Sequence, residues 1–115
     1  MIYSEVKANA AAVYTTNLVK GAPLTVTKSH IADGKAQAVI CNSGNANTCN
    51  ANGIEIANQM CALVEKATGI CANDVVVAST GVIGQKLDIA PIAGGMEKLY
   101  AGLSYEGNAA AGEGI

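Results

Sequence analysis

The sequence predicts an α/β fold in which a sheet with a strand–helix–strand crossover is covered by packed helices. Two short apolar stretches, residues 36–41 and 74–78, have the length and composition of buried strands. Between them, residues 52–69 place apolar side chains at intervals of three and four, the spacing of an amphipathic helix. Because parallel strands need a crossover connection of this kind, the three segments predict a strand–helix–strand unit.

Two further strands are expected before this unit. Residues 10–16 contain Val, Tyr and Thr side chains, which favour extended structure. In residues 23–27, Leu and Val alternate with Thr, a period of two that predicts a second strand. Residues 28–32 are expected to form one helical turn before the turn at Asp33 and Gly34. The predicted order is therefore three strands, a helix, a strand and a helix.

The helix over residues 52–69 has sequence signals at both ends. Asn52 and Glu55 have the spacing of a capping box, with Asn52 as the N-cap. Gly69 fits the left-handed position just beyond a helix, and the apolar Ile70 that follows is its usual companion. These signals predict both boundaries of the helix.

A second helix is predicted over residues 89–103. Asp88 is placed to cap its N-terminus, and Pro91 falls in the first turn, where proline is tolerated. Residues 104–115 resemble the start of a further helix, with three consecutive alanines. We therefore expect the C-terminal quarter of the chain to be helical.

The composition indicates a single folded domain, residues 1–115. Half of the residues are hydrophobic and 14% are charged, so the chain is too apolar to be disordered. Phe and Trp are absent, and the core must be built from Ile, Val, Leu, Met and Ala. A net charge of −2, without Arg and without a basic stripe, argues against a nucleic-acid partner. No aliphatic stretch approaches a membrane span and no signal peptide is recognisable, so we expect no membrane partner and a cytoplasmic location.

The cysteine pattern indicates reduced thiols rather than a metal site. Cys41, Cys49, Cys61 and Cys71 contain no closely spaced pair, and His30 is the single histidine. Structural zinc sites need tighter pairs of ligands, and disulfides need an oxidising compartment. We expect no metal, and we expect Cys41 and Cys61, which lie in apolar patterns, to be small buried side chains.

Two polar loops follow the predicted apolar strands, where α/β proteins place ligand sites. The first, residues 42–50, has four Asn among nine residues. The amides of Asn42, Asn45 and Asn47 either bind a polar substrate or brace the loop by bonding its own backbone. We expect the loop to be ordered, with these amides bonded to nearby backbone, and to lie at the same end of the sheet as the second loop.

The second loop, residues 79–84, combines a hydroxyl with glycine. The Thr80 hydroxyl and the backbone N–H of Gly81, where no Cβ blocks close approach, have the chemistry of an oxyanion hole. The alternative is a glycine turn without a chemical role. Ser79 is expected to matter little if it faces away from the site.

Taken together, three motifs carry a resemblance to a known family. In order, they are AAVYTTN at residues 11–17, VICNSGNAN at residues 39–47 and VASTGVIG at residues 77–84. They closely resemble the ornithine acetyltransferase family, the bifunctional glutamate N-acetyltransferases of arginine biosynthesis. The similarity extends through nearly the whole chain. Cys41 departs from the family, in which an aliphatic residue is usual at this position.

The resemblance implies a larger ornithine-acetyltransferase-like fold and a specific chemistry. A precursor cleaves itself ahead of a threonine, and this threonine takes acetyl from N-acetylornithine and passes it to glutamate. Some members also use acetyl-CoA as the acetyl donor, and no metal or other cofactor is needed. In this family a Thr-Gly pair forms the oxyanion hole, and the pair maps onto Thr80 and Gly81.

The resemblance also implies that essential parts lie outside these residues. The nucleophilic threonine of the family follows a Met-Ala segment further along the precursor, and residues 1–115 contain no matching segment. The chain therefore resembles an internal part of the α chain, whose partners would be the remaining α-chain and β-chain portions in an α₂β₂ assembly. Two alternatives are a stand-alone α/β module that binds a polar ligand through its Asn-rich loop, and a structural subunit without activity. The coding sequence beyond codon 115 discriminates among the three.

Overall fold

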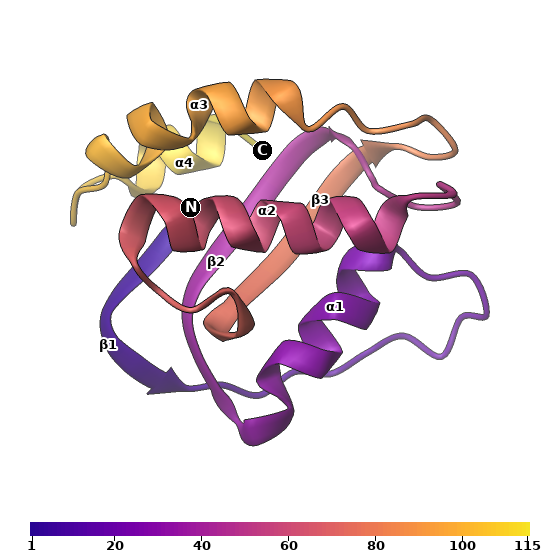
Figure 1. Ribbon diagram of the computed structural model, residues 1–115, viewed down its shortest axis with the longest axis horizontal. Helices are drawn as coiled ribbons and strands as arrows, with labels where there is room; N and C mark the ends of the chain where they lie inside the picture. The colour runs from indigo at the N-terminus through magenta and orange to yellow at the C-terminus, as the bar shows by residue number, and fades with distance from the viewer.

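A computed structural model describes residues 1–115 and confirms the α/β class (Figure 1). The helices and strands are β1 Ile2–Asn9, α1 Ala22–His30, β2 Lys35–Asn45, α2 Gly53–Thr68, β3 Val75–Val82, α3 Ala90–Ala101 and α4 Asn108–Glu113. The sheet has the order β1-β2-β3, and β1 is antiparallel to β2 whereas β2 is parallel to β3. The unit β2–α2–β3 is the predicted strand–helix–strand unit. None of the helices is both long and apolar enough to cross a membrane.

One layer of helices packs on one face of the sheet. Helix α2 crosses β2 and β3 and contacts α1 on one side and α3 on the other (Figure 1). Its residues Met60, Cys61 and Val64 are fully buried against Val75 and Val77 of β3. The core therefore consists of small aliphatic and sulfur-containing side chains, as the composition predicts.

The four cysteines occupy different environments. Cys61 lies in the core, and its burial raises the pKa of the thiol to about 12. The prediction of a small buried thiol is confirmed at Cys61, whereas Cys41 is only half-buried because it faces away from the helices. Cys49 and Cys71 are exposed.

The first predicted strand is wrong. Residues 10–16 have no regular structure, and the strand lies earlier, at Ile2–Asn9. The last ladder contact is the hydrogen bond from Ala10 N to Gly34 O at 2.8 Å, after which the chain leaves the sheet. Because strand preference reflects packing against neighbours, Val13, which is 99% exposed, gains nothing from an extended conformation.

Residues 23–27 were also expected to form a strand, but they lie in helix α1. Pro23 suits the first turn of a helix, and Pro23, Val26 and Thr27 form a buried face at helical spacing. The Thr27 hydroxyl donates to Val77 O at 2.9 Å and accepts from Val77 N at 3.1 Å. One turn later, His30 Nδ1 lies 2.9 Å from Val75 O. Helix α1 therefore satisfies backbone groups along the outer edge of β3, and these contacts override the local alternation.

The helix boundaries are largely as predicted, although the two predicted N-terminal caps are not. Gly69 is left-handed (φ +81°), and its N–H donates to Glu65 O at 2.8 Å. The Asn52 side chain makes no capping bond, so the predicted capping box is wrong: Glu55 instead accepts from Gln59 at 3.1 Å. Helix α3 runs from Ala90 to Ala101, and its N-cap is Ile89 rather than the predicted Asp88, although Asp88 Oδ1 accepts from Ala90 N at 2.9 Å.

Besides its pairing with β2, strand β1 contacts α3 and the segment before β3 through side chains. The ring of Tyr3 packs against Tyr100 of α3, with centroids 5.9 Å apart. Lys7 forms an ion pair of 2.7 Å with Asp74, immediately before β3. This hydrogen-bonded pair holds the pKa of Lys7 above its usual value.

We predict that Thr27→Val lowers the free energy of unfolding by about 1–3 kcal/mol, because two backbone groups of Val77 lose their buried partner. Thr25→Val is the matched control on the exposed face of the same helix, with an expected change within about 0.5 kcal/mol. Urea denaturation followed by circular dichroism measures both. Equal effects of the two substitutions would contradict the role given to the Thr27 hydroxyl.

Candidate active site at the carboxyl ends of β2 and β3

The two polar segments lie side by side at the carboxyl ends of β2 and β3, as predicted. They are not entirely loops, however, because the parallel ladder continues into both. Its last pairs are Asn42 with Ser79, Ser43 with Thr80, Gly44 with Gly81 and Asn45 with Val82. The strands can continue because side-chain amides and glycines adapt to the bend that the ladder takes here.

The bend brings two glycines into direct contact. Gly44 and Gly81 have φ angles of +119° and +126°, which L side chains rarely adopt. A Cβ on Gly81 would lie 2.2 Å from the carbonyl carbon of Gly44 and 2.6 Å from Asn45 N. Position 81 therefore requires glycine for two reasons, its backbone conformation and the close approach of β2.

A group of polar side chains joins the two strands beside these glycines. Ser79 Oγ donates to Asn45 O at 2.7 Å and accepts from Asn42 Nδ2 at 3.0 Å. Asn42 Nδ2 also lies 3.0 Å from Asn45 O. These three contacts form a triangle that joins β3 to β2 at the residue before Thr80.

The other two candidate amides hold the segment that follows. Asn45 Oδ1 accepts from Asn47 N at 2.8 Å, and Asn45 Nδ2 donates to Gln85 O at 3.0 Å. Asn47 is fully buried and left-handed (φ +49°), and its Nδ2 donates to Gly53 O at 2.9 Å. All three candidate Asn side chains therefore donate to nearby backbone carbonyls, as the sequence predicts.

Thr80 points away from this group. Successive side chains of a strand alternate between faces, so Thr80 shares the face of Val76 and Ala78, opposite the helices. Both Thr80 and Gly81 are exposed, and the Thr80 hydroxyl makes no hydrogen bond within the chain. The hydroxyl is therefore available to a reacting group on the helix-free face of the sheet.

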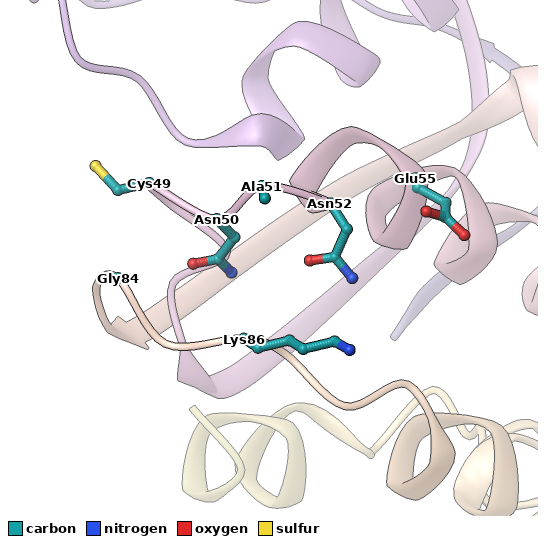
Figure 2. A pocket seen from close by; sticks show the side chains of 7 residues that line it. All are labelled: Cys49, Asn50, Ala51, Asn52, Glu55, Gly84 and Lys86. Atoms are coloured by element: carbon teal, nitrogen blue, oxygen red, sulfur yellow. The ribbon is translucent and has the colours of Figure 1, made fainter.

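A polar cleft lies beside this site, around the N-terminus of α2. It has a volume of about 560 Å³ and is lined by Cys49, Asn50, Ala51, Asn52, Glu55, Gly84 and Lys86 (Figure 2). Lys86 extends along one side, across from the amides of Asn50 and Asn52 (Figure 2). The sequence did not indicate this cleft, because Lys86 joins the other lining residues only through the fold. Nowhere in the chain do three His, Cys, Asp or Glu side chains gather as metal ligands.

Comparison with known proteins decides the family. The model of the ArgJ family matches residues 1–115. The chain belongs to the ArgJ family. The arginine biosynthesis bifunctional protein ArgJ of Symbiobacterium thermophilum is 45% identical over 116 residues, which cover 100% of this chain and 29% of the relative. That of Listeria monocytogenes (serovar 1/2a) is 49% identical over 111 residues, 95% of this chain and 27% of the relative.

Two solved ArgJ structures show the same fold. The arginine biosynthesis bifunctional protein ArgJ of Bacillus halodurans superposes with a TM-score of 0.80 at 45% identity, over 84% of this chain and 51% of that one. Ornithine acetyltransferase of Mycobacterium tuberculosis, solved in complex with ornithine, gives 0.74 at 35% identity, over 78% and 50%. The resemblance to ornithine acetyltransferases is thereby confirmed. The chain spans less than a third of the length of the curated ArgJ relatives, and its fold is part of a larger one.

We predict that Gly81→Ala destabilises the fold more than Gly84→Ala does. Both glycines have positive φ, so each alanine costs about 1–2 kcal/mol of backbone strain, but a Cβ on Gly84 meets no atom within 4 Å. The difference between the two free energies of unfolding measures the clash with Gly44 together with the greater backbone strain of a side chain at φ +126° than at φ +78°. A Gly81→Ala variant as stable as Gly84→Ala would show that the strands do not approach this closely.

Proposed function

We propose that this chain is part of the α-chain portion of a glutamate N-acetyltransferase, which moves acetyl from N-acetylornithine to glutamate in arginine biosynthesis. Membership of the ArgJ family supports the activity, and the ornithine-bound relative supports the substrate class. The observation that carries the assignment to this site is the exposed Thr80–Gly81 pair, held at the carboxyl end of the sheet with an unengaged hydroxyl. The enzyme acts in the cytoplasm.

In this reaction, Thr80 and Gly81 stabilise the negative charge that develops on the substrate. A threonine hydroxyl from the remaining part of the precursor attacks the amide carbonyl of N-acetylornithine, and the carbonyl oxygen becomes negatively charged. The Thr80 hydroxyl and the Gly81 N–H donate to this oxygen. Ornithine leaves with a proton on its amine, and the acetyl group stays on the nucleophile as an ester. The amine of glutamate then attacks the ester, which releases N-acetylglutamate and restores the threonine. Acetyl-CoA serves the same step as an alternative acetyl donor.

The orientation of Thr80 defines the side from which the nucleophile arrives. Helices α1, α2 and α3 occupy one face of the sheet (Figure 1). The other face presents Val39, Cys41, Val76 and Ala78, which are only half-buried. An apolar face of this kind is covered by a further layer in α/β proteins. The remaining α-chain and β-chain portions, in an α₂β₂ assembly, supply this layer and bring the nucleophile to Thr80.

The stand-alone binding module is less well supported. It would use the amides of Asn42, Asn45 and Asn47 to bind a polar ligand, but all three amides already donate to the chain's own backbone. Their arrangement fits bracing of the segment beside Thr80.

Thr80→Ala is expected to lower kcat by about 10²–10³ with little change in KM, because the lost donor acts mainly in the transition state. Thr80→Ser keeps a hydroxyl and should retain much more activity. Steady-state kinetics of both variants in the full-length, fully cleaved protein measure the effect, with cleavage checked on a gel. A Thr80→Ala enzyme that matures normally and keeps kcat within about threefold of wild type would disprove the oxyanion role.

Residues 1–115 alone are expected to have no acetyltransferase activity, because they contain no segment that matches the nucleophile's context. The test is to incubate the purified chain with N-acetylornithine and glutamate and to assay ornithine. Release of ornithine above a heat-killed control would place the nucleophile within this chain instead.

A further inference from the structure

We infer that Ser79, together with Asn42, is a positioning residue that holds Thr80 and Gly81 in the geometry needed to bind the oxyanion. The inference rests on the proposed function, because it assigns Ser79 a role in the same reaction. It concerns a side chain that faces away from the reacting atoms, and it predicts a larger effect than the small one expected for such a residue from the sequence.

The hydrogen bonds of Ser79 cross the bend that contains the two donors. Ser79 is paired with Asn42 in the ladder, whereas Asn45 is paired with Val82, on the other side of Thr80 and Gly81. The bond of 2.7 Å from Ser79 Oγ to Asn45 O therefore ties the residue before Thr80 to the strand beyond the Gly44–Gly81 contact. Asn42 Nδ2, 3.0 Å from both Ser79 Oγ and Asn45 O, closes the triangle.

This triangle is the side-chain support closest to the donors. The Thr80 hydroxyl makes no hydrogen bond within the chain and Gly81 has no side chain, so neither residue fixes its own position through a side-chain hydrogen bond. Two consecutive donors must both aim at one oxygen, and a shift of about 1 Å can lower a rate by roughly 10²-fold. The ladder pairs Thr80 with Ser43 and Gly81 with Gly44, and the side-chain hydrogen bonds that support the Thr80–Gly81 peptide come from the residue before it, Ser79.

Loss of the Ser79 hydroxyl should lower kcat and leave KM nearly unchanged. The oxyanion exists in the transition state and not in the bound substrate, so misplaced donors weaken transition-state binding alone. A merely structural hydroxyl on the same strand would lower stability without this selectivity. Thr27 supplies that comparison, because its hydroxyl holds the backbone of β3 at Val77, two residues before Ser79.

The experiment uses the full-length, matured enzyme with Ser79→Ala, Ser79→Thr and Thr27→Val, and measures kcat, KM and thermal midpoint for each. We expect Ser79→Ala to lower kcat about 10-fold or more with KM within about threefold, and Ser79→Thr, which keeps the hydroxyl, to restore most of the loss. Thr27→Val should lower the thermal midpoint and leave kcat of the folded enzyme within about twofold. Should Ser79→Ala fail to mature, Asn42→Ala removes the donor to Ser79 Oγ and takes its place.

A double-mutant cycle with Thr80→Ala tests whether Ser79 acts through its neighbour. In the Thr80→Ala background, the further loss from Ser79→Ala should fall below about threefold, because one of the two donors that Ser79 positions is gone. A full multiplicative loss, or a Ser79→Ala enzyme with wild-type kcat beside an impaired Thr80→Ala enzyme, would overturn the positioning role and leave the proposed function standing. A Thr80→Ala enzyme with wild-type kcat would instead overturn the proposed function.

Discussion

The parallel ladder between β2 and β3 is the constraint on which the rest of the structure depends. Its first part, Ala38 to Ile40 paired with Val75 to Val77, lies beneath α2 and contributes to the core. Its last part carries Asn42 to Asn45 past Ser79 to Val82. Because one register runs through both parts, the packing of small aliphatic side chains under the helix also sets the positions of the polar groups at the site.

Strand β3 lies at an edge of the sheet in this chain, and an edge leaves backbone groups without partners. Helix α1 satisfies some of them through Thr27 and His30, one turn apart on the same helix face. This arrangement explains why residues 23–27 were wrongly predicted to form a strand. A Thr that bonds a strand fifty residues away has the same local signature as a Thr in an alternating strand, so the pattern at residues 23–27 was ambiguous without its partner.

The elements that the sequence predicted correctly have either a long repeating pattern or a chemically specific residue. The helical repeat over residues 52–69 and the left-handed Gly69 identified α2, and the two apolar stretches around it identified the cores of β2 and β3. The ends of these strands were missed, because Asn and Gly signal loops locally and the ladder that extends into them is a tertiary property. The cleft around Lys86 was missed for a similar reason: its lining comes from two loops and the start of α2, which meet only after folding.

Successive side chains of β3 lie on opposite faces of the sheet, so Ser79 and Thr80 face different surroundings. Ser79 turns toward the helices, where Asn42 and the Asn45 carbonyl engage its hydroxyl, and Thr80 turns to the open face with its hydroxyl unengaged. Under the proposed function, the free Thr80 hydroxyl would bind the transient negative charge, and Ser79 would hold it in position. Gly81 contributes through its backbone. Its backbone approaches Gly44 so closely that no side chain fits. In the proposed enzyme, the absence of a side chain would leave the Thr80–Gly81 pair uncovered on the side where the remaining layer would pack.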